Sequence, residues 1–128
     1  MKRFHQIFGI SIVIVFLLTG QYMAIHLNSL NGMPDGQRML YRSRHIYILL
    51  SGLLNVGIGT YLTDRLTRGR RILRLVGSGM IATAPGLFLL AFFYEPNLPA
   101  LQTPLSLLGM LIIFAGTLLH LFSRWRKK

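Results

Sequence analysis

The sequence contains no cysteine and only three acidic residues, and each shortage excludes a class of protein. Without cysteine there are no disulfides, no thiolate metal sites and no cysteine nucleophile. Charged residues make up 13% of the chain, about half the share of an ordinary soluble domain. The glycine-rich phosphate loop, the zinc-protease motif and the serine-hydrolase elbow are also missing. A water-soluble enzyme of these classes is therefore excluded.

Long apolar runs are abundant instead. Four of them contain no Asp, Glu, Lys or Arg, namely Ile7–Leu27, Ile46–Leu62, Leu75–Tyr94 and Leu105–Phe122. A helix crosses the hydrocarbon core of a bilayer with roughly 20 mainly apolar residues, and about 17 suffice. With 52% hydrophobic residues and a mean hydropathy of +0.52, the chain is typical of a multi-pass membrane protein.

The segments between these runs predict where the helices end. Asn31-Gly32 and Pro34 are turn formers, and Pro96 and Pro99 interrupt the chain before Pro104 starts a new helix. We expect one all-α transmembrane domain over 1–128, with helices at about 5–27, 44–63, 71–95 and 104–123. Residues 37–44 are expected to form an amphipathic lead-in to the second helix. Because the connections are short, neighbouring helices should run antiparallel in an up-down four-helix bundle.

Basic residues predict the orientation in the membrane. The net charge is +11, and most basic residues lie beside the apolar runs, where the positive-inside rule accounts for them without nucleic acid. If all four runs span, eleven basic residues share one side and three the other. The larger group predicts a cytoplasmic location for both termini, in a bacterial-type inner membrane; it comprises Lys2, Arg3, Arg65, Arg68, Arg70, Arg71, Arg74, Arg124, Arg126, Lys127 and Lys128.

The first apolar run has a second interpretation. Lys2 and Arg3 followed by Ile7–Gly20 resemble the first two regions of a signal peptide. Cleavage after Ala24 would place the bulky Tyr22 where a small residue is needed. Retention as a membrane helix is the favoured reading.

Small residues predict how the helices pack. At 100° per residue, Gly52, Asn55 and Gly59 share one side of the second helix, and Gly109 and Gly116 share one side of the fourth. Close backbone approach at small residues holds membrane helices together. Asn55 is the costliest polar residue to bury, so we expect it to hydrogen-bond across helices.

The four histidines are the candidate cofactor ligands. His26 and His45 are expected at the outer end and His5 and His120 at the inner end, each facing the bundle interior. Two such layers of paired imidazoles are typical of b-type haem sites, or of metal sites, in helical bundles. Interfacial or packing histidines are the plainer interpretation.

Two weaker candidates lie at the outer end. Imidazole with thioether suits copper(I), and several such side chains flank the first outer loop: Met23, His26, Met33, Met39 and His45. Arg38, Arg42 and Arg44 form a basic edge that can bind an anionic lipid headgroup, or simply extend toward lipid phosphates.

Function follows partly by elimination. Glu95, at the outer edge, is the only carboxylate near membrane depth, so the usual carboxylate proton relay of a transporter is missing. The leading hypothesis is a non-enzymatic accessory protein that binds lipid, a membrane-protein partner or further copies of itself. The alternative is a membrane redox protein with haem b held by paired histidines, His26 and His45 first. A small-molecule carrier is disfavoured by the small interior of one such bundle.

Overall fold

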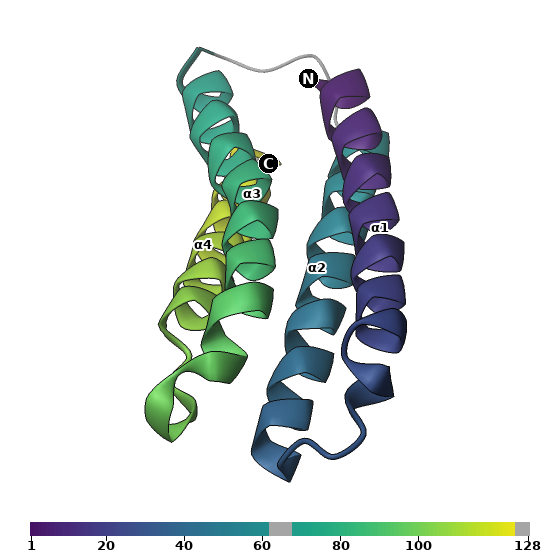
Figure 1. Ribbon diagram of the computed structural model, residues 1–128. Coiled ribbons are helices and arrows are strands. Elements are labelled where there is room, and N and C mark those ends of the chain that lie inside the picture. The colour runs from purple at the N-terminus through teal and green to yellow at the C-terminus, as the bar shows by residue number, and fades with distance from the viewer. Residues whose placement is uncertain (62–67, 125–128) are drawn as a thin grey trace.

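The computed structural model describes residues 1–61 and 68–124, and these form four long α-helices (Figure 1). The helices are α1 (Lys2–Ile25), α2 (Asp35–Tyr61), α3 (Arg68–Tyr94) and α4 (Pro104–Arg124). Short 3₁₀ turns at Asn28–Leu30, Glu95–Asn97 and Pro99–Leu101 lie in the connections. No strand occurs within the described ranges, and the all-α prediction is confirmed.

The largest departure from the predicted boundaries is at α2, which begins at Asp35 rather than at 44. Pro34 precedes the helix, and the Asp35 carboxylate in the first turn is favourable beside the positive end of the helix dipole. Arg38, one turn later, forms an ion pair with Asp35. The expected lead-in of 37–44 is thus continuous with the helix, whose predicted last residues, 62 and 63, lie outside the described residues.

Three helices of the described residues, rather than the four predicted, are long and apolar enough to cross a membrane. They correspond to Lys2–Ile25, Gly69–Asn97 and Pro99–Ser123. The exception is α2, which has Asp35, Arg38, Arg42 and Arg44 in its first three turns and whose described residues end at Tyr61. The apolar part that remains is shorter than the other three.

Glycines set the closest helix contacts, and the packing faces predicted for the second and fourth helices are confirmed. A Cβ added to Gly9 of α1 would lie 2.7 Å from the Gly52 carbonyl oxygen of α2. A Cβ added to Gly77 of α3 would lie 2.9 Å from the Gly116 carbonyl oxygen of α4. Backbones this close leave no room for a side chain, as expected where small residues form the interface.

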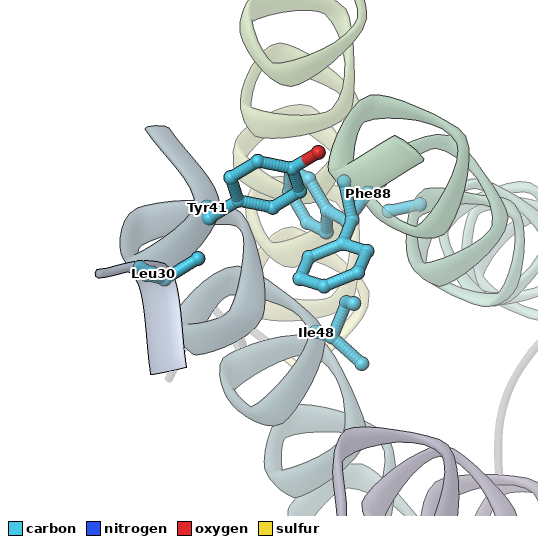
Figure 2. Packing of buried hydrophobic residues seen from close by; sticks show 6 residues of the cluster. Leu30, Tyr41, Ile48 and Phe88 are labelled. Carbon is cyan, nitrogen blue, oxygen red and sulfur yellow. The ribbon is translucent and has the colours of Figure 1, made fainter. Parts of the chain in front are cut away.

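Contacts between α2 and α3 join the α1–α2 pair to the α3–α4 pair, which lie side by side in Figure 1. The core cluster at this junction comprises Leu30, Tyr41, Ile48, Ala84, Phe88 and Phe92. In Figure 2, Tyr41 and Ile48 of α2 pack around Phe88 of α3. Figure 1 shows that the start of α1 and the end of α4 lie toward the same end of the helices. Of the basic residues behind the predicted orientation, Arg65, Arg126, Lys127 and Lys128 lie outside the described residues.

Candidate functional site

Four polar side chains, one from each helix, gather near the amino-terminal end of α1. We call them the histidine cluster: His5, Asn55, Ser78 and His120. His5 Nδ1 lies 2.8 Å from Asn55 Oδ1, and His120 Nε2 lies 3.1 Å from Ser78 Oγ. The two imidazole rings are 6.4 Å apart between centroids and nearly perpendicular, at 82°. The two histidines that were predicted to pair at one end of the helices, His5 and His120, are thus in close contact.

Asn55 determines which nitrogen of His5 carries the proton. The Asn55 amide nitrogen donates to the Ser51 carbonyl at 2.9 Å and faces the Ile81 carbonyl at 3.4 Å. Carbonyls only accept, so the amide orientation is fixed and its oxygen must face His5. That oxygen requires a donor, and His5 Nδ1 therefore carries the hydrogen. The predicted cross-helix hydrogen bonding of Asn55 is confirmed.

The other nitrogen of His5 follows from this assignment. In neutral imidazole one nitrogen donates and the other holds a lone pair, so His5 Nε2 is an acceptor. The residue is 0% exposed, and Nε2 has no hydrogen-bond partner within the part of the chain that the structure describes. A buried polar atom without a partner is uncommon in proteins and calls for an explanation.

The outer histidine pair is not brought together. His45 lies against α1, where its ring stacks on Phe16 with centroids 4.0 Å apart and its Nδ1 is 2.9 Å from Thr19 Oγ1. His26 follows the last residue of α1, is exposed, and has a ring contact with Tyr22. No hydrogen bond or ring contact of the described residues joins His26 to His45. The prediction that His26 faces the interior is wrong, because this residue is exposed at the end of α1.

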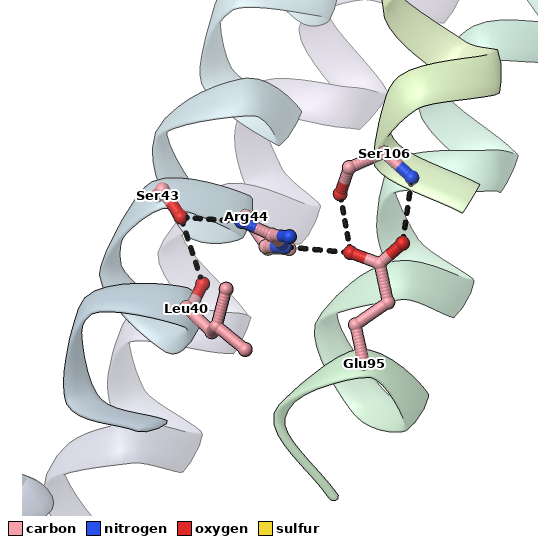
Figure 3. A network of polar contacts seen from close by, with 5 residues as sticks. All are labelled: Leu40, Ser43, Arg44, Glu95 and Ser106. Atoms are coloured by element: carbon pink, nitrogen blue, oxygen red, sulfur yellow. Dashed lines mark hydrogen bonds and ion pairs between the residues drawn. The ribbon is translucent and has the colours of Figure 1, made fainter. Parts of the chain in front are cut away.

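A second buried group, the arginine cluster, consists of Ser43, Arg44, Glu95 and Ser106 (Figure 3). Arg44 Nε donates to Glu95 Oε2 at 2.7 Å, and Arg44 Nη1 donates to Ser43 Oγ at 2.7 Å. Arg44 is 4% exposed and Glu95 is 0% exposed. Charges this deep are tolerated when they are paired and hydrogen-bonded, and this pair ties α2 to the end of α3.

Glu95 also caps α4. Its Oε1 accepts the backbone N–H of Ser106 at 2.8 Å, and its Oε2 accepts the Ser106 hydroxyl. The first turn of a helix has unpaired N–H groups and a positive dipole end, and a carboxylate satisfies both. The predicted helix start at Pro104 is confirmed. The side chain that caps it comes from Glu95, nine residues before the start of the helix.

The three arginines of the predicted headgroup edge therefore separate into two environments. Arg42 is exposed and Arg38 is partly exposed beside Asp35, so both remain on the surface. They line a shallow hollow of about 400 Å³ on α2 together with Met39. Arg44 points into the interior and is neutralised by Glu95. Only Arg38 and Arg42 stay accessible to a headgroup.

An apolar groove lies between α2 and α4, beside the histidine cluster. Its volume is about 350 Å³, and its walls include Leu53 and Ile58 of α2 and Leu121 of α4. His120 and Arg74 also line it. The groove gives His120, but not His5, a route to the surroundings.

The described residues contain no group of three or more His, Asp or Glu side chains that could hold a metal ion. A site on the histidine cluster would thus offer two imidazoles and no carboxylate. No family model, curated protein or solved structure matches the chain. The candidate chemistry therefore rests on the geometry alone.

Proposed function

We propose that the chain is a multi-pass membrane protein without enzymatic activity, an accessory protein that binds lipid or a membrane partner along its outer helices. One observation carries this proposal: α1 and α4 leave most of their apolar surface uncovered. In the most apolar 18-residue stretch of each helix, only 11% is buried in α1 and 17% in α4, compared with 44% in α3. Exposed apolar surface on this scale marks an interaction with lipid or with another protein.

The uncovered residues form continuous faces. On α1 they include Ile7, Ile14 and Leu18, and on α4 Leu111 and Phe114, all more than half exposed. Such faces are stable in hydrocarbon, and a further copy or a membrane-protein partner can pack on the same surface. Arg38 and Arg42, at the charged end of α2, are suited to anionic lipid phosphates.

We include α2 among the helices that cross the membrane, although its described residues alone are not apolar enough over a sufficient length. The polar side chains Arg44, Ser51 and Asn55 are all buried against other helices, whereas Ile46 and Leu53 are exposed. Arg44 is paired with Glu95, and Asn55 has cross-helix partners. Polar groups in membrane helices are expected to face the interior and to be paired in this way.

With four crossings, both termini would be cytoplasmic in an inner membrane. The cysteine-free chain permits a direct test with single cysteines at Lys2, Asn31 and Lys128. In intact cells, a membrane-impermeant maleimide should label the variant at Asn31, while the other two should react only after the membrane is opened. Labelling of the two ends from opposite sides would contradict the topology.

The accessory role is tested by photo-crosslinking in the native membrane. A photoreactive residue in place of Ile14 should give adducts with lipid or with a discrete protein, whereas the same residue at the buried Ile48 should crosslink only within the chain. Mass spectrometry of the adducts distinguishes lipid, a second copy and another protein. Recovery of the chain in plain buffer without detergent would contradict the whole proposal.

A haem-binding redox protein is the alternative, and one observation favours it: two imidazoles meet in the histidine cluster, and one has a buried lone pair. The geometry favours His5 with His120 over the pair ranked first from sequence, His26 with His45.

A further inference from the structure

We propose that His5 and His120 bind a transition-metal centre through imidazole nitrogen, with His5 Nε2 as a ligand. The inference goes beyond both the haem alternative and the accessory role, and it rests on neither. It starts from the tautomer that Asn55 imposes: His5 presents a lone pair on Nε2 in a fully buried position, and no donor among the described residues meets it. A neutral imidazole of this form is the commonest protein ligand for metal ions.

His120 supplies the second donor. A metal held about 2 Å from one nitrogen of each ring places the ring centroids roughly 6 Å apart. The observed separation is 6.4 Å. His120 comes from α4 and His5 from α1, so the centre would join the first and last helices. Bundle metal sites are built in this way, from side chains on facing helices.

The number of donors limits the kind of centre. Zinc sites usually take three or four protein ligands, and the described residues offer no third His, Asp or Glu here. Haem iron needs only axial ligands, but its porphyrin needs open space beside the ligand atom, and His5 Nε2 is fully buried. Copper(I) accepts low coordination and binds imidazole. The centre that fits two buried imidazoles is thus a bare copper(I) ion.

Asn55 is the positioning residue of this site. Ligating histidines usually donate their second ring N–H to an acceptor that fixes the tautomer, and loss of that acceptor typically weakens metal affinity by about 10–100-fold. The Asn55 oxygen, 2.8 Å from His5 Nδ1, meets this description. Its own two contacts with backbone carbonyls keep it in place.

The experiment uses the full chain purified in detergent. Elemental analysis and an absorption spectrum are recorded first, and the protein is then titrated separately with copper(I) and with haemin. We expect saturable binding of copper(I) and none of haemin. A Soret band that depends on His5 would overturn the assignment to copper(I).

Variants locate the site. His5→Gln keeps an N–H donor for Asn55 but has no lone-pair nitrogen, and it should weaken binding at least tenfold, as should His120→Ala. Asn55→Leu should weaken binding by about 10–100-fold and change the histidine ¹⁵N shifts that report the tautomer. His26→Ala is the matched control, because it removes an exposed imidazole and should bind like the parent.

Two further results would overturn the site: no saturable binding of copper(I) by the parent, or parental affinity for copper(I) in folded His5→Gln. Helix content from circular dichroism establishes that each variant is folded. These measurements are separate from the maleimide and crosslinking experiments, so the metal site can fail while the accessory role stands, and the reverse.

Discussion

Glu95→Ala should lower the free energy of unfolding by about 3–5 kcal/mol, because it leaves Arg44 charged, buried and without its carboxylate. The same change removes the acceptor for the Ser106 N–H at the start of α4. Both partners are almost fully buried, so solvent offers little compensation. The loss is measured as the shift in detergent-solubilised unfolding, followed by circular dichroism while the fraction of denaturing detergent is increased.

The chain contains its own control for this variant. Asp35 forms an ion pair with Arg38, but the Asp35 side chain is 90% exposed. Exposed ion pairs contribute little, so Asp35→Ala should leave the unfolding midpoint nearly unchanged. Equal effects of Glu95→Ala and Asp35→Ala would show that Glu95 is not buried against Arg44.

Replacing both charges tests whether the loss is electrostatic. In Arg44→Met/Glu95→Leu no unpaired charge remains, and apolar replacements of buried ion pairs are often neutral or stabilising. The Ser106 N–H still lacks its acceptor, which costs about 1–3 kcal/mol. The double variant should therefore recover part, but not all, of the stability lost in Glu95→Ala. A double variant less stable than Glu95→Ala would contradict this account.

The helices and their packing faces could be predicted from the sequence because both depend on local periodicity. Uncharged apolar runs indicate the helices, and the 100° spacing places Gly52, Asn55 and Gly59 on one side. The early start of α2 was the exception. Its first turns are charged, so hydropathy could not separate a helix from a surface segment there.

The partner of Arg44 could not be predicted, since Glu95 lies 51 positions away and its approach depends on how α2 and α3 pack. The helical spacing nevertheless indicated that the Arg44 side chain is buried. Arg44 is 11 residues before Asn55, which places the two within about 20° on the helix, whereas Arg42 points about 200° away from Arg44. The same spacing failed for His26, which is exposed at the end of α1 although its backbone is still helical and its N–H donates to the Tyr22 carbonyl.

Gly77→Ala should destabilise the protein by about 1–3 kcal/mol, the usual cost of forcing an extra methyl group into a packed interface. The new Cβ would lie 2.9 Å from the Gly116 carbonyl oxygen and 3.1 Å from Leu119 Cβ. The first of these atoms belongs to the backbone, so it can move only if α4 moves away from α3. The loss is measured by the same detergent-based unfolding.

Gly79→Ala is the matched control, two residues further along the same helix. An added Cβ there meets nothing within 4 Å, and alanine favours a helix over glycine by about 0.5–1 kcal/mol. The two substitutions make the same chemical change and should have opposite signs. Because intrinsic helix preference is common to both, the difference between them isolates the contact between α3 and α4. Equal stabilisation by both would mean that Gly77 does not face α4 and that the small-residue interface is misassigned.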